Sequence, residues 1–176
     1  MTLGWNVVGV GVLAVAALAA HSVALAGFGL DSLIEILASI VVVWQLTDTG
    51  AERERTAMRI IGGAFFALAV YIAVQGAYVL MTGGPPAPSP PGIAWTAITC
   101  AAMLALAFGK ARTGAALGNA VLMTEGRVTL VDAYLAGAVL LGLLLNAALR
   151  WWWADPLAGF VIVFYGVKEG WEALHH

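Results

Sequence analysis

The apolar positions of the chain gather into six long runs, and polar, glycine-containing or proline-containing segments separate them. A bilayer core of about 30 Å is crossed by roughly 20 helical residues, so runs of this length predict membrane-spanning helices. The sequence therefore predicts an all-α, polytopic membrane protein with six transmembrane helices in a single domain, residues 1–176. The predicted spans are residues 3–25, 30–46, 58–81, 93–108, 119–149 and 156–174.

Three boundaries between these runs have recognisable breakers. Gly27, Gly29 and Asp31 separate the first run from the second, so the first turn is expected there. Residues 83–92 are rich in glycine and proline, which cannot continue a helix and predict an extended loop. Pro156 follows an aspartate at the start of the last run, where the first turn of a helix favours proline.

The composition supports a membrane protein and excludes several classes. Apolar residues make up 62% of the chain and charged residues 10%, whereas soluble domains carry about a quarter charged residues. A net charge of −2 gives no basic field for nucleic acid. The single cysteine, Cys100, excludes a disulfide framework and a cysteine-based metal site. No nucleophile–base pair or phosphate-binding loop is present in the sequence, so neither an enzyme nor an organic cofactor is expected.

Lysine and arginine gather at one side of the predicted bundle. Cytoplasmic loops carry the excess of these residues, which places both termini in the cytoplasm of a multi-pass cell-membrane protein. The residues on that side are Arg53, Arg55, Arg59, Lys110, Arg112 and Lys168, and the other side has only Arg150.

The chain also contains an internal repeat with a spacing of 97 residues. Residues 22–25 align with residues 119–122, and the alignment continues without a gap into the second and fifth predicted spans. Repeats whose interface builds a site near the middle of the membrane are a recurring transporter architecture. The matched pairs include Gly29 with Gly126, Ser32 with Thr129, and Glu35 with Asp132.

The ionisable residues of the second span are the first candidates for chemistry. Asp31 and Glu35 are four residues apart, so both face the same side of a helix. A charge at bilayer depth costs a few kcal/mol, and two neighbouring carboxylates also repel each other. Such a pair persists only with a compensating cation or proton. A cap at the start of the second helix is the competing role for Asp31.

The fifth span supplies a second group of candidates. Glu125, Val128, Thr129 and Asp132 share one helical face. Carboxylate oxygens bind zinc and harder divalent cations, and two facing helices can supply three or four ligands. Other roles remain open: Asp132 pairs with Arg127, or Thr129 returns its hydroxyl to the carbonyl of the preceding turn.

Two segments carry a resemblance to a known family. Ser-x-Ala-Leu at residues 22–25, followed by Leu-Asp-Ser-Leu-x-Glu at residues 30–35, resembles the first-to-second-span region of the cation diffusion facilitators. Trp-Ala-Asp-Pro-Leu-Ala at residues 153–158 is similar to the start of their sixth span. The resemblance implies a six-span, usually dimeric exporter of divalent metals, driven by proton exchange across the lipid bilayer.

The resemblance also implies a ligand set. Asp31 and Glu35 match the two acids of span two, and Asp132 matches the second ligand of span five. The first span-five ligand falls on Val128, which cannot bind metal, so Thr129 or Glu125 would have to fill the position. An all-oxygen set favours manganese over zinc as the transported ion. Val128→His is accordingly expected to strengthen binding and to favour zinc.

Other departures from the family affect assembly and activity. The sequence stops at His176, so we expect the protein to lack the family's cytoplasmic C-terminal domain, through which members commonly dimerise. His175 and His176 are not expected to form a site. A homodimer is therefore expected to form through the spans, where small residues allow close helix approach. The alternative function is a non-transporting membrane subunit or scaffold whose acids serve helix association. The small residues considered for the dimer contact are Gly62, Gly63, Ala64 and Ala67.

Overall fold

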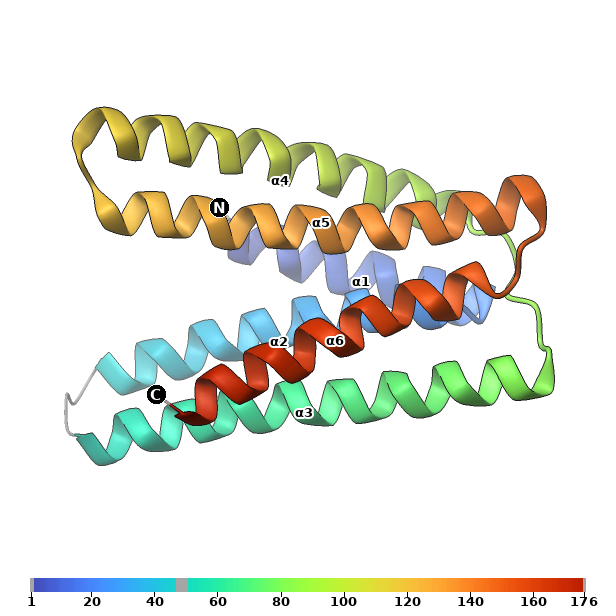
Figure 1. Ribbon diagram of the computed structural model, residues 1–176, viewed down its shortest axis with the longest axis horizontal. Coiled ribbons are helices and arrows are strands. Elements are labelled where there is room, and N and C mark those ends of the chain that lie inside the picture. Colours follow the sequence, from blue (N-terminus) through green and yellow to red (C-terminus); the bar gives the residue numbers. More distant parts are fainter. Residues whose placement is uncertain (1, 47–50, 176) are drawn as a thin grey trace.

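The computed structural model of the protein describes residues 2–46 and 51–175, and every regular element in these ranges is an α-helix. The helices run roughly parallel to one another along the long axis of the molecule (Figure 1). The all-α fold predicted from the apolar runs is confirmed. The helices are α1 (Thr2–Ala20), α2 (Val23–Leu46), α3 (Ala51–Thr82), α4 (Pro90–Leu117), α5 (Ala120–Leu149) and α6 (Ala154–His175).

Helix α2 lies at the centre of the bundle. It contacts α1, α3, α5 and α6, while α4 packs along α5 and α6 packs along α3. The turns after α1, α3 and α5 lie at one end of the bundle, and the α4–α5 turn and the C-terminus lie at the other (Figure 1). The start of α1 is set back from that second end, so the N-terminus lies part-way along the bundle (Figure 1). The second end is the one predicted to be cytoplasmic.

The first turn does not lie where the sequence pattern placed it. The structure breaks the chain at His21 and Ser22, and α2 already begins at Val23. His21 has a φ of 52°, a left-handed conformation that ends α1. Gly27 and Gly29 lie inside α2 because a Cβ at either would meet a neighbouring helix, 2.9 Å from Ile162 Cδ1 and 3.1 Å from Leu13 Cβ respectively. The prediction of a break at Gly27–Asp31 was wrong, since these glycines serve close packing.

The segment between α3 and α4 is an extended loop up to Ser89, as predicted. The prediction that the loop continues to Gly92 was wrong, because α4 already begins at Pro90, where the first turn of a helix accepts proline. Ser89 ends it as the N-cap of α4, where its hydroxyl accepts a hydrogen bond from Gly92 N at 3.2 Å. Asn146 of α5 ties the loop to the bundle through a hydrogen bond from Nδ2 to Pro86 O at 3.0 Å. The loop is therefore held against the end of the bundle that lies opposite the C-terminus.

The outer surface of the bundle is largely apolar. Large apolar side chains such as Leu18, Phe108 and Phe164 are about three-quarters exposed, as expected where lipid replaces water. The protein is membrane-integral. Within residues 2–46 and 51–175, four helical segments are long and apolar enough to cross a membrane, and α1 contributes a shorter apolar helix. The four segments are Val23–Val41, Arg55–Thr82, Pro90–Leu117 and Gly126–Leu149.

One of the small residues considered for a dimer contact is used inside the protomer instead. A Cβ at Gly62 would lie 3.1 Å from Gly170 O and 3.0 Å from Leu174 Cγ, so Gly62 packs α3 against α6. Gly63 and Ala67 remain exposed on the outer face of α3. Of the small residues considered for the dimer contact, Gly63 and Ala67 are therefore exposed to a second copy, whereas Gly62 is not.

Candidate metal site

A small cavity in the bundle brings residues of four helices together. Asp31 and Glu35 of α2 line it with Asp132 of α5, Asn6 of α1 and Thr99 of α4. Its volume is about 10 Å³, which is about the smallest volume that holds one water molecule. The site thus has room for a bare ion or one water, and not for a hydrated cation or an organic molecule.

Asp31 is the most deeply placed of the three acids, with an exposed fraction of 5%. Among the described residues, no group donates a hydrogen bond to its carboxylate and no cation pairs with it, so its oxygens open onto the cavity. The charges of Glu35, Asp132 and Glu169 also act on it. A buried carboxylate whose charged neighbours among the described residues are all negative is costly unless a cation or a proton neutralises it. The competing role of helix cap is wrong, because Asp31 lies more than two turns inside α2.

Glu35 differs from Asp31 in having a polar partner. The amide Nδ2 of Asn6 donates a hydrogen bond to Glu35 Oε2, which links α1 to α2 at the cavity. Asn6 is itself 6% exposed. Sequence reasoning missed this residue, and its one available clue was a carboxamide within an otherwise apolar first helix.

The candidate ligands on α5 do not all lie at the cavity. Asp132 is half-buried and lines the cavity. Thr129 is 4% exposed, but it does not line the cavity, and its hydroxyl accepts a hydrogen bond from Lys110 Nζ of α4 at 3.0 Å. Val128 is 50% exposed and points away from the cavity lining. The side chain of Glu125 lies outside the described residues.

The predicted ligands therefore converge only in part. Asp31, Glu35 and Asp132 share the cavity. Within the described ranges, however, no three histidine, cysteine, aspartate or glutamate side chains come close enough to hold one metal ion. A cation bound here would have to draw the carboxylates inward or use further ligands from the cavity wall.

The start of the acid-bearing helix is fixed by α6. Asp155 is 0% exposed, and its carboxylate accepts hydrogen bonds from Ser22 Oγ at 2.5 Å, Val23 N at 2.9 Å and Ala24 N at 3.4 Å. These bonds satisfy backbone donors at the start of α2, where a negative charge is also favoured. Asp155 thereby sets the position of α2 relative to α6. The Asp-Pro pair indicated a helix start in the sequence but gave no sign of this partner.

Helix α6 also brings two residues towards the acids that sequence reasoning did not select. Tyr165 donates a side-chain hydrogen bond to Glu169, and the charges of Asp31, Glu35 and Asp132 reach Tyr165. The side chain of Glu169 is 30% exposed. The negative field of the cavity therefore extends along α6 towards the end of the bundle that holds the C-terminus.

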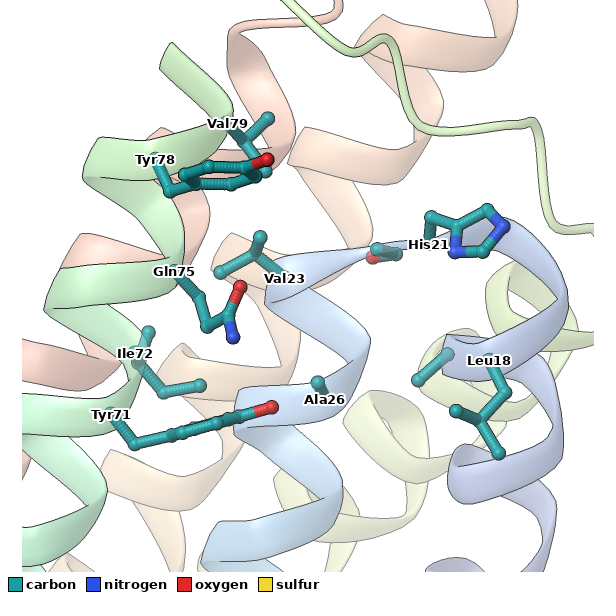
Figure 2. A pocket seen from close by; sticks show the side chains of 11 residues that line it. Leu18, His21, Val23, Ala26, Tyr71, Ile72, Gln75, Tyr78 and Val79 are labelled. Carbon is teal, nitrogen blue, oxygen red and sulfur yellow. The ribbon is translucent and has the colours of Figure 1, made fainter. Parts of the chain in front are cut away.

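A larger cleft opens near the opposite end, between the α1–α2 turn and α3. It has a volume of about 310 Å³ and is lined by apolar side chains together with His21, Tyr71, Gln75 and Tyr78. Figure 2 shows Tyr71 and Gln75 extending from α3 towards Ala26 and Val23 of α2. No carboxylate is among its described lining residues, so it lacks the ligands that a divalent cation needs.

The all-helical bundle agrees with a comparison with known families. A model of the cation efflux transmembrane domain matches residues 2–175. The chain belongs to the cation diffusion facilitator family. Members of this family are transporters that carry divalent metal ions across a membrane. Cation transport across a membrane is accordingly the function of the domain that this chain contains.

Proposed function

We propose that this protein exports a divalent metal cation in exchange for protons, and that Asp31, Glu35 and Asp132 bind the cation between α2 and α5. The observation that carries the proposal is the buried Asp31 carboxylate, which accepts no hydrogen bond from a described residue and faces a cavity with two further acids. A divalent cation would neutralise this cluster, and protons would do so after the cation leaves. The same carboxylates thus alternate between the two kinds of ion.

The ligand atoms favour a hard cation. The acids lining the cavity supply carboxylate oxygens, and no histidine or cysteine is among the described lining residues. Oxygen-only sites suit manganese, magnesium and calcium, whereas zinc prefers sites that include nitrogen or sulfur. Manganese is accordingly the cargo that the site favours over zinc.

The proposed orientation places both termini in the cytoplasm of a cell membrane, with all six helices crossing it. The α4–α5 turn and the C-terminus share one end of the bundle, and Lys110, Arg112 and Lys168 lie towards that end. This supports a cytoplasmic assignment by the positive-inside rule. A homodimer would use the exposed outer face of α3 around Gly63 and Ala67.

Thermal unfolding with and without ions tests the proposal. Manganese or zinc should raise the melting temperature of the wild type, because a ligand present at 100 times its Kd stabilises the folded state by about 2.7 kcal/mol. Asp31→Asn, Glu35→Gln and Asp132→Asn should each reduce this shift at least several-fold. Without metal, Asp31→Asn should raise the melting temperature, because a buried charge and its repulsion are removed.

The matched control is Glu172→Gln, which neutralises an acid whose side chain is 55% exposed and which pairs with Lys168 at 3.4 Å. This variant should keep the full ion-dependent shift. A non-transporting scaffold predicts no ion-dependent shift in the wild type. It also predicts that neutralising the acids changes stability equally with and without metal, and either result would contradict the proposal.

A further inference from the structure

The acids of the cavity leave part of the coordination of a cation unfilled. Manganese takes about six oxygen ligands in an octahedral arrangement. Among the side chains of α5 that the structure describes, only Asp132 lines the cavity, because Val128 is half exposed and Thr129 accepts a hydrogen bond from Lys110. The cavity is too small for a shell of water molecules. A further protein ligand would therefore have to come from another wall of the cavity.

Helix α1 presents a suitable group at this wall. Asn6 is 6% exposed and lines the same cavity as Asp31 and Asp132. Its Nδ2 donates to Glu35, so its amide orientation is fixed by the acceptor oxygen that it faces. The carbonyl oxygen Oδ1 accepts no hydrogen bond from any described group. Carboxamide oxygens are ordinary ligands of hard divalent cations.

The position of Asn6 is fixed by its neighbours on α1. The indole of Trp5 stacks on Trp95 of α4 with ring centroids 5.0 Å apart, and its Nε1 donates to Thr99 Oγ1 at 3.2 Å. One turn later, Gly9 allows close approach, since a Cβ there would lie 3.3 Å from Trp95 Cζ2. These contacts hold the start of α1 against α4. Helix α1 starts part-way along the bundle (Figure 1), and Asn6, near its start, bonds to Glu35 of α2.

We infer that Asn6 is a further ligand of the transported cation and contributes to its preference for hard ions. Its carbonyl oxygen binds the ion, while its amide N–H groups hold Glu35 in place. The first helix thereby supplies the ligand that α5 lacks. This inference rests on the proposed function, because it names a residue of the same site.

Manganese binding by the purified full chain tests the inference, with the Kd measured from the electron paramagnetic resonance signal of free Mn²⁺. Asn6→Leu should weaken binding by about 10-fold or more, since even an outer-shell partner of a metal ligand contributes 10- to 100-fold. Asn6→Asp keeps the shape and adds a charged oxygen, so it should strengthen Mn²⁺ binding. Asn6→His should raise the affinity for zinc relative to manganese.

The direction of the Asn6→Asp effect separates a ligand from a residue that only positions Glu35. An aspartate cannot donate to Glu35 and repels it, so a positioning role predicts weaker Mn²⁺ binding, as for Asn6→Leu. This result would overturn the inference. Because Asn6→Asp retains the size of the side chain, it tests the inference even if Asn6→Leu fails to fold.

The control is Asn146→Leu, because Asn146 is also buried, at 5% exposed, and bonds to the loop at the other end of the bundle. It should lower stability without changing the Kd. If the wild type binds neither Mn²⁺ nor Zn²⁺, the proposed function fails and this inference fails with it. If Asp31→Asn abolishes binding while Asn6→Leu retains the wild-type Kd, only the inference about Asn6 fails.

Discussion

The α1–α2 pair and the α4–α5 pair have related sequences and similar positions in the two halves of the bundle, yet their polar residues differ. Helices α2 and α5 begin 97 residues apart, which agrees with the repeat in the sequence. Helix α1 brings an amide, Asn6, to the acid Glu35, whereas α4 brings the cation Lys110 to Thr129. The α1–α2 pair brings two acids and an amide to the cavity, whereas the α4–α5 pair places a lysine one helical turn from the acid that it brings there, Asp132.

The features that the two pairs share are those of helix packing. A Cβ at Gly29 would lie 3.1 Å from Leu13 Cβ of α1, and a Cβ at the matching Gly126 would lie 3.1 Å from Ala111 N of α4. Each glycine allows its helix to approach the preceding one closely. The two matched glycines therefore make similar close contacts in both pairs, whereas the residues around the acids differ.

The repeat also explains why acids distant in sequence reach the same depth. Glu35 and Asp132 each lie 12 residues beyond the first residue of their helix, a distance of about 18 Å along the axis. Helices α2 and α5 start at opposite ends of the bundle (Figure 1). Equal distances from opposite ends converge near the middle, so the inverted repeat fixes the depth of the cavity. The chemistry at that depth is then set by the residues that α1 and α4 add.

The largest expected effect concerns the starts of the two helices. Asp155→Ala should lower the free energy of unfolding by about 2–4 kcal/mol, because the Ser22 hydroxyl and the Val23 N–H lose a buried acceptor. Asn119 precedes α5 at the position that matches Ser22 in the repeat. Asn119→Ala should lower the free energy of unfolding by about 1 kcal/mol, since Asn119 is exposed. Chemical denaturation in detergent measures both values. Equal losses at the two positions would contradict a special anchoring of α2 by α6.

The sequence predicted residues of the site where a charged side chain stood within an otherwise apolar segment. Acids inside an apolar run identified Asp31, Glu35 and Asp132 as unusual, and all three line the cavity. The sequence pattern predicted less well at glycines, because glycine both breaks helices and allows them to pack closely. Gly27 and Gly29 resembled helix breakers, although they serve close packing between helices that only the folded bundle defines.

Partners distant along the chain could not be predicted from one sequence. Ser22 and Asp155 are 133 residues apart, and nothing in either local pattern connects them. Asn6 gave the same difficulty, because an asparagine in an apolar helix serves equally well as a helix contact or as a ligand. Its role depends on the stacking of Trp5 on Trp95, which places the start of α1 at the cavity.

The second prediction removes the positive charge from the α4–α5 pair. Lys110→Met should strengthen Mn²⁺ binding by about fivefold, because a charge one to two turns from the site is worth on the order of 1 kcal/mol. The ammonium of Lys110 lies 3.0 Å from Thr129 Oγ1, one helical turn from Asp132. Arg112→Met, at an exposed position near the same end of α4, is the control and should leave the Kd unchanged. Weaker binding by Lys110→Met would indicate that the lysine supports the site instead of opposing the cation.

The smallest effect on metal binding is expected from Val128→His, which places a histidine at the family's first ligand position on α5. The sequence alone predicted that Val128→His would strengthen binding, but Val128 is 50% exposed and does not line the cavity. A histidine at this position would lie on the exposed surface of α5 and outside the cavity. We therefore expect the zinc Kd of Val128→His to stay within about twofold of the wild type. Asn6→His, from the cavity wall of α1, should have the larger effect on zinc. Isothermal titration calorimetry with Zn²⁺ compares the two variants. Stronger zinc binding by Val128→His than by Asn6→His would contradict this prediction. It would mean that α5 turns Val128 towards the ion when a cation binds.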